Sequence, residues 1–174
     1  TGFSFSPSFV WTKIRSSAYD HVLWDAVRGA GVSKELVSND SRAEGGASTN
    51  AYGYLSAFNP DGFSTTAGSS NNYYFNQSGQ TYVAWAWDAG SSTVSNTDGT
   101  ITSQVRANPS AGFSIVSYTG TGSVGTIGHN LNAKPELIIV KNRTNASDWY
   151  VFGDSIDSTY DERLTLNSTA AKTC

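Results

Sequence analysis

The sequence predicts an all-β fold, either a sandwich or a barrel. Short segments rich in β-branched and aromatic residues recur along the chain, and turn-forming residues bracket each of them. Their spacing is about 8–12 residues, which is typical of all-β sandwiches and barrels. No segment carries an apolar period of 3.6 residues over three helical turns, so we expect no long helix.

The expected strands follow from these segments. They cover residues 9–14, 21–25, 34–38, 52–58, 63–66, 82–88, 100–105, 113–118, 137–141, 149–152 and 164–167. Between them, NPDG at 59–62 and TDG at 97–99 are turn signals. Pro fixes φ, Asp bonds nearby backbone groups and Gly accepts a positive φ, so each of these residue types favours a reversal of the chain.

The segment YVAWAWD at 82–88 has the period of a pleated strand. Val83, Trp85 and Trp87 fall on one face, and small side chains such as Ala84 fall on the other, which can lie close to a second layer. We expect Trp85 and Trp87 to be buried, with a cost of about 3–5 kcal/mol when either is replaced by Ala. The predicted core residues are four tryptophans: Trp11, Trp24, Trp85 and Trp87.

An internal repeat is the most informative feature. When Pro7 is set against Pro135, PSFVWTKIRS aligns with PELIIVKNRT, and we call the spacing between these two prolines the repeat offset. The same offset pairs Leu36 with Leu164 and Asn39 with Asn167 further along. A spacing of this length is the size of a domain, so it predicts related modules. The strands at 9–14 and 137–141 should therefore be structurally equivalent.

The repeat also predicts the domain organisation. We expect a β-sandwich module at 1–90, a linker of small residues at 91–99, and the start of a second related β module, incomplete, at 100–174. The second copy has no counterpart of residues 53–89, so its strands are expected to expose unpaired edges and an apolar face. Either a continuation of the polypeptide or a neighbouring protomer would cover them.

Composition argues against several classes of function. The net charge is −3 and no Lys/Arg cluster occurs, so we expect no nucleic-acid partner. No apolar run reaches the roughly 18–20 residues of a spanning helix, so we expect no membrane insertion. Asp61, Asp88 and Asp98 occupy loop positions from which calcium ligands could come. With His21 and His129 far apart in the chain, we assign no catalytic residue, no metal site and no cofactor.

Tyrosines are the candidate ligand-binding residues. The run SSNNYYFNQSG is a polar loop in which the tyrosines follow no core period, and exposed rings can stack on the C–H faces of sugars. The candidates for glycan stacking are Tyr52, Tyr54, Tyr73 and Tyr74. The alternative is that these rings pack against a neighbouring module or protomer.

A family resemblance rests on these motifs taken together. The run PSFVWTKIRS, HVLWDAVRGAG, FNPDGFS and YVAWAWDAG, followed by NPSAGFSIVSYTGTG and KPELIIVKNRT, resembles a domain of unknown function repeated in large structural proteins of marine bacteriophages, often described as tail-fibre or lectin-like. The resemblance implies a concanavalin- or lectin-like β-sandwich of the jelly-roll type with part of a second module. It also implies that HVLWDAVRG runs from a strand through Asp25, Arg28 and Gly29 into a turn. It supplies no catalytic residues.

The resemblance implies a function as well. We expect a non-enzymatic virion protein, a tail-fibre or surface-appendage module that serves assembly and attaches to a host-surface glycan. Its location would be the virion surface, and its partners would be other virion proteins, further copies in a homo-oligomer and a cell-surface glycan. Two alternatives stay open: a capsid-decorating protein and a polysaccharide-degrading enzyme of the tailspike type.

Overall fold

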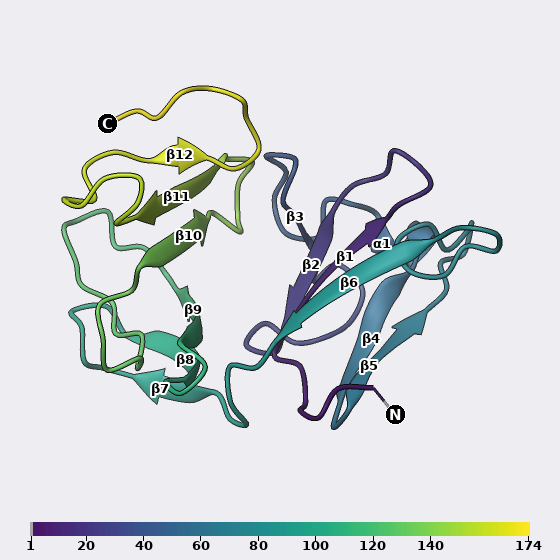
Figure 1. The fold of residues 1–174 in the computed structure, drawn as a ribbon, viewed down its shortest axis with the longest axis horizontal. Helices are drawn as coiled ribbons and strands as arrows, with labels where there is room; N and C mark the ends of the chain where they lie inside the picture. Colours follow the sequence, from purple (N-terminus) through teal and green to yellow (C-terminus); the bar gives the residue numbers. More distant parts are fainter. Residues whose placement is uncertain (1) are drawn as a thin grey trace.

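The computed structural model describes residues 2–174 and is all-β, with four antiparallel sheets (Figure 1). We name them sheet A (β3-β2-β1-β6), sheet B (β4-β5), sheet C (β7-β8-β9) and sheet D (β10-β11-β12). One helical turn, α1 (Thr49–Tyr52), precedes β4. The strands are β1 (Phe9–Ile14), β2 (Val22–Asp25), β3 (Leu36–Val37), β4 (Tyr54–Asn59), β5 (Gly62–Thr66), β6 (Tyr82–Trp87), β7 (Val94–Asn96), β8 (Ser103–Asn108), β9 (Phe113–Tyr118), β10 (Leu137–Lys141), β11 (Trp149–Gly153) and β12 (Leu164–Thr165).

The predicted strands are all present, and β1, β9 and β10 have the predicted bounds. Two elements were not predicted, α1 and β7. The expected linker at 91–99 contains β7, which pairs with β8, so this stretch is not an unstructured connection. Asn96 of β7 is buried, and its side-chain oxygen accepts the N–H of Asp98 at 2.9 Å. A short polar strand of this kind carries no apolar period that sequence analysis can detect. The module boundaries stay a prediction.

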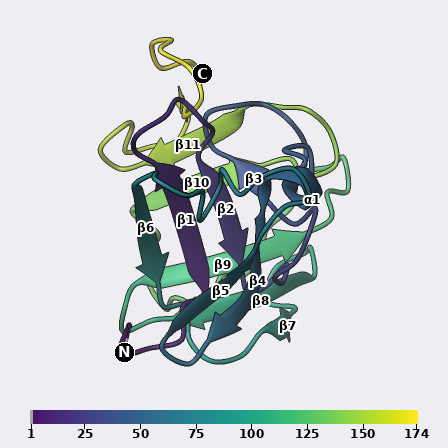
Figure 2. The same ribbon diagram turned by 90° about the vertical axis from the view of Figure 1, so that its right-hand side faces the viewer.

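Sheets A and B pack face to face around the main hydrophobic core. Figure 2 shows β4 and β5 crossing in front of the strands of sheet A. Alternate residues of β1 point into this layer, as the pleat requires. The buried cluster consists of Val10, Val22, Trp24, Val37, Ala47, Leu55 and Tyr74. Trp24 is fully buried, as predicted, and its Nε1 donates a hydrogen bond to the carbonyl oxygen of Gly31 at 3.2 Å.

The prediction that Trp85 and Trp87 are buried is wrong. Trp85 is 45% exposed and Trp87 is 37% exposed. The predicted alternation is right, because the register sets Trp85 opposite Trp11 and Trp87 opposite Phe9, on the face of sheet A that points away from sheet B. The small residue Ala84 points toward sheet B and lines a cavity of about 380 Å³ beside aromatic side chains of the facing layer. Ala84 is itself exposed beside this cavity, and no residue of β6 is buried.

The outward face of sheet A is aromatic and half-covered. Trp11 is only partly buried, in contrast to the core position that we predicted for it, and its ring centroid lies 5.9 Å from that of Trp85. Phe113 of β9 stacks on Trp87 with ring centroids 6.0 Å apart. Sheet C therefore covers one end of this face. The other tryptophan, Trp85, keeps much of its ring in contact with solvent.

The repeat predicted from the sequence is confirmed by the strand pairing. Phe9 lies opposite Asp25 in the first copy, and Leu137 lies opposite Gly153 in the second, so both partners shift by the repeat offset. The third strands, β3 and β12, begin at residues 36 and 164 and pair with β2 and β11 in the same register. Three strands thus recur with identical pairing.

A side-chain clamp recurs with the strands. The Asn39 side chain accepts the backbone N–H of His21 at 2.8 Å and donates to Asp20 at 2.9 Å. Asn167 makes the same two bonds, both at 2.9 Å, with the residues at the equivalent positions of the second copy. Each clamp ties the end of the third strand to the start of the second. The asparagine pair in the sequence repeat therefore has a structural reason.

The turn after β2 is held by one carboxylate. Asp25 accepts the backbone N–H groups of Val27 at 3.1 Å and Arg28 at 2.9 Å, and it also accepts the Arg28 side-chain Nε at 2.5 Å. Gly29 follows with a φ of 90°, a conformation that disfavours residues with a Cβ. The predicted path from strand through Asp25, Arg28 and Gly29 into a turn is confirmed.

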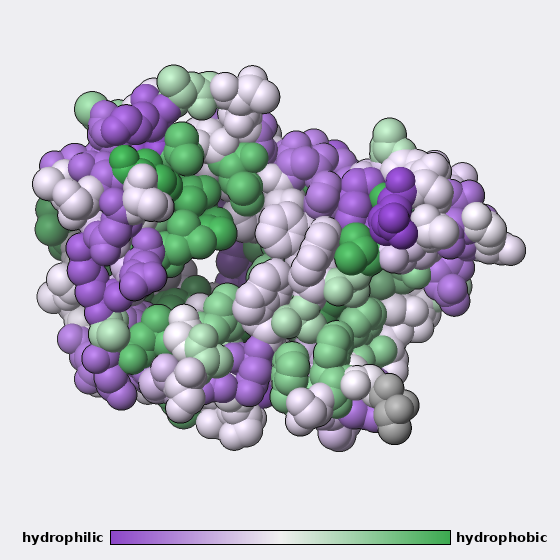
Figure 3. All heavy atoms as spheres, in the orientation of Figure 1, coloured by the Kyte–Doolittle hydropathy of each residue, from purple (hydrophilic) through white to green (hydrophobic). Residues whose placement is uncertain are grey.

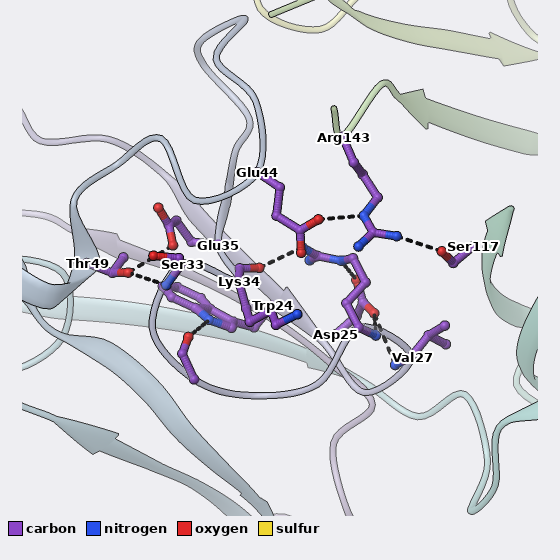
Figure 4. Close-up of polar contacts among 12 residues, drawn as sticks. Trp24, Asp25, Val27, Ser33, Lys34, Glu35, Glu44, Thr49, Ser117 and Arg143 are labelled. Atoms are coloured by element: carbon purple, nitrogen blue, oxygen red, sulfur yellow. Dashed lines mark hydrogen bonds and ion pairs between the residues drawn. The ribbon is translucent and has the colours of Figure 1, made fainter. Parts of the chain in front are cut away.

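A polar bridge connects this turn to the second half of the chain (Figure 4). The Glu44 carboxylate accepts Nη1 of Arg28 at 3.3 Å and Nε of Arg143 at 2.6 Å. Arg143 in turn donates to the hydroxyl of Ser117 at 2.8 Å. Nearby, Nε1 of Trp149 donates to the carbonyl oxygen of Val37 at 2.7 Å in a buried contact. These contacts hold sheets C and D against the end of sheet A.

Candidate functional site

The four tyrosines predicted to contact a glycan differ in how far the structure buries them. Tyr52 ends α1 and is 37% exposed, and Tyr73 is partly buried in the loop before β6. Tyr74 is 5% exposed and its hydroxyl donates to the carbonyl oxygen of Ala47 at 3.1 Å within the core. Tyr54 packs against the same core. Tyr52 and Tyr73 therefore stay candidates, whereas the rings of Tyr54 and Tyr74 serve packing.

A third tyrosine completes an exposed aromatic group. Tyr19, in the loop between β1 and β2, is 38% exposed and stacks on Tyr73 with ring centroids 4.2 Å apart and an interplanar angle of 19°. The rings of Tyr52 and Tyr73 lie 6.3 Å apart at 43°. We call Tyr19, Tyr52 and Tyr73 the tyrosine cluster. Sequence analysis missed Tyr19, since only its place in a polar loop distinguishes it.

Close approach of two loops positions the tyrosine cluster. A Cβ at Gly68 would overlap the carbonyl oxygen of Ala51, and Gly53 has a φ of 92°, so both positions require glycine. The loop that carries Tyr73 is held from below by Tyr82, whose hydroxyl donates to the Tyr73 carbonyl oxygen at 3.0 Å. The rings are thus presented by a supported backbone.

Charged groups flank the tyrosine cluster. Asp20 follows Tyr19 in the chain and pairs with Arg42 at 3.0 Å. Arg42 also pairs with Asp40 at 2.7 Å, and this hydrogen bond holds the pKa of Asp40 below its ordinary value. Hydrogen bonding with Tyr73, followed by desolvation, raises the pKa of Tyr19, so the phenol is neutral at physiological pH. The surface combines neutral rings with carboxylate and guanidinium groups that can bond hydroxyls.

The buried carboxylates Asp25 and Glu35 serve structural contacts. Glu35 is fully buried and accepts the Thr49 hydroxyl at 2.9 Å (Figure 4). It also accepts the backbone N–H of Ala47 at 2.8 Å. Within residues 2–174 no group of three or more His, Cys, Asp or Glu side chains is placed to hold a metal ion. His21 accepts Nε1 of Trp11 at 3.1 Å, and desolvation, with a smaller effect of Lys13, lowers the pKa of His21.

An open depression of about 510 Å³ lies at the other end of the molecule. Asp98, His129, Asn130 and Lys134 line it, together with the loop 126–128. Asp98 belongs to the turn after β7, where it accepts the Asn96 amide at 3.0 Å. None of the tyrosines assigned to glycan stacking lines this depression.

The fold places the chain among all-β proteins made of several antiparallel sheets. No helix in the described part of the chain is long and apolar enough to cross a membrane. Comparison with protein families is more specific: the chain belongs to the family described as domain of unknown function DUF7483, which it matches over residues 1–174. A comparison with curated proteins and one with solved structures each gave no match.

Proposed function

We propose that the chain is a non-enzymatic structural module of a virion surface appendage, such as a tail fibre, and that it attaches to a host-surface glycan through the tyrosine cluster. The stack of Tyr19 on Tyr73, with Tyr52 beside it and both Tyr19 and Tyr52 exposed, carries the proposal. The assignment to a virion rests on the family resemblance of the sequence motifs. The lectin-like, jelly-roll type of sandwich is part of the same proposal, and the facing of sheets A and B over one core supports it.

Sugar chemistry fits the tyrosine cluster. A pyranose ring presents C–H groups on its faces and hydroxyls at its rim. Aromatic rings stack on the C–H faces, and charged side chains such as Asp20 and Arg42 hydrogen-bond the hydroxyls. Because Tyr19 and Tyr73 stack on each other, a sugar would contact the outer face of this pair together with the edge of Tyr52. The supported loops limit the entropy lost on binding.

A glycan array with the whole chain, followed by titration calorimetry on the best ligand, tests the proposal. Tyr19→Ala and Tyr52→Ala should each weaken binding about tenfold, equivalent to about 1.4 kcal/mol. Tyr118→Ala is the matched control, because Tyr118 is 41% exposed at the end of β9, outside the tyrosine cluster. Absence of binding to any glycan, or an equal loss in the Tyr118 variant, would refute the assignment.

A further inference from the structure

The two copies of the repeat differ at one edge. In sheet A, β1 lies between β2 and β6 and is paired on both sides. In sheet D, the equivalent strand β10 is the outermost strand and pairs only with β11 among the described residues. The pairing of β10 with β11 repeats that of β1 with β2 residue for residue. The side of β10 that corresponds to the β6 side of β1 therefore has no strand bonded to it within residues 2–174.

The direction of the backbone groups on β10 follows from neighbouring hydrogen bonds. The N–H of Asp154 donates to the carbonyl oxygen of Glu136 at 3.2 Å, so the carbonyl of Glu136 points toward β11. Because these directions alternate along an antiparallel strand, the backbone groups of Leu137, Ile139 and Lys141 point to the open edge. In the first copy, the backbone N–H of Ala26 donates to the carbonyl oxygen of Ser8 at 2.8 Å. The odd-numbered residues of β1 therefore point their backbone groups toward β6.

The side chains around this edge are apolar and exposed. Leu137 is 59% exposed and Ile139 is 45% exposed, and Ile138 is 37% exposed although its counterpart Val10 is fully buried. Figure 3 shows hydrophobic residues gathered over β10 and β11, beside a hollow that separates them from sheet A. An unpaired, apolar edge strand is a template for another strand. It accepts extended segments by β-augmentation.

We propose that the open edge of β10 binds an extended segment of another polypeptide that has the residue pattern of β6, in the register that β6 adopts on β1. The first copy identifies the occupant, because the same strand in the same register is completed there by β6. The β1–β6 pairing sets Phe9 opposite Trp87 and Lys13 opposite Val83. The segment would therefore place bulky residues beside Leu137 and Ile139 and small residues beside Ile138. It would carry no charge within the strand, as β6 carries none.

A peptide with the sequence of residues 81–89, TYVAWAWDA, tests the proposal on the whole chain. Labelled with a fluorophore and extended by two lysines for solubility, it should bind with saturable anisotropy, at least about tenfold more tightly than a scrambled peptide of the same composition. Equal binding of the two peptides would overturn the proposal. The site is separate from the tyrosine cluster, so sugar binding and peptide binding can fail independently.

Backbone methylation tests the register. The backbone N–H of Arg15 donates to the carbonyl oxygen of Thr81 at 2.7 Å, so the odd-numbered residues of β6 point their backbone groups at β1. N-methylation at the position of Trp85 should weaken binding about tenfold, whereas N-methylation at Ala84 should leave it within about twofold. If both methylations weaken binding equally, the proposed register is wrong.

A substitution in the chain locates the edge. Ile139→Pro removes an N–H that points to solvent, a position at which edge strands tolerate proline, so the fold should persist while peptide binding falls about tenfold. Far-UV circular dichroism checks the fold, and Ile139→Val keeps the N–H and should bind within about twofold. Unchanged peptide binding by a folded Ile139→Pro variant would overturn the proposal. So would concentration-dependent dimerisation of the unmodified chain that this variant abolishes but that the peptide does not inhibit, because a different segment of a second copy would then occupy the edge.

Discussion

The contrast between Trp24 and Trp85 gives the sharpest test of the fold. Trp24 is fully buried between sheets A and B, its ring centroid lies 5.2 Å from that of Phe75, and its Nε1 has a backbone acceptor. Trp24→Ala removes all of these contacts, and the surrounding sheets can collapse only in part. We expect a loss of about 3–5 kcal/mol in the free energy of unfolding.

Trp85 should behave differently, although it lies in the more regular apolar pattern. Its ring is 45% exposed, so Trp85→Ala removes only about half of the buried surface and leaves a site that water can enter. We expect a loss of about 1–2 kcal/mol. For a chain of this size, about 2–4 °C of melting temperature corresponds to 1 kcal/mol, so the expected decreases are about 6–20 °C for Trp24→Ala and about 2–8 °C for Trp85→Ala.

Urea unfolding followed by far-UV circular dichroism measures both losses without depending on the fluorophore that each variant lacks. Equal slopes against urea concentration would show that the surface exposed on unfolding is unchanged. Trp24→Phe serves as a control, because it keeps most of the ring volume and should lose less than Trp24→Ala. A Trp85→Ala loss as large as that of Trp24→Ala would refute the assignment of the two faces of sheet A.

Three further predictions follow from contacts within and between the two copies. A double-mutant cycle of Glu44→Ala and Arg143→Ala, measured by urea unfolding, should give a coupling free energy of about 0.5–1 kcal/mol. Salt should reduce this coupling, because Arg143 is partly exposed. If the losses of the two single variants simply add, the ion pair contributes nothing to stability. Asn39→Ala and Asn167→Ala should each lower the free energy of unfolding by about 1 kcal/mol, since the two asparagines make the same bonds. Losses that differ threefold would contradict the equivalence of the two clamps. Burial lowers the pKa of His21 in the folded chain, so the stability that its neutral form provides is complete above about pH 6.5 and falls as the pH drops toward the lower folded value. His21→Gln should flatten this part of a stability-versus-pH curve, and an unchanged curve would exclude His21 as the cause.

Several features could be predicted from the sequence because they depend on local or repeated patterns. Alternation defines a strand such as β6 and assigns its residues to two faces, and the repeat offset predicts the equivalence of β1 with β10 and of the third strands. The glycan-stacking prediction was right about the exposure of Tyr52 and wrong about Tyr74, which the core encloses. Whether a ring in a polar loop points inward is decided by the partners that the loop meets.

The sequence alone assigns residues to the faces of a strand and identifies the segments that repeat, because backbone geometry and sequence spacing suffice for both. Which face becomes the core was decided only by the tertiary structure. The large face of β6 looks more hydrophobic, yet Trp85 and Trp87 lie on the face of sheet A that points away from sheet B, and only Ala84 and its neighbours face the rings of the other layer. Tyr19 stacks on Tyr73 although the two rings come from loops far apart in the chain, so only the tertiary structure brings them together.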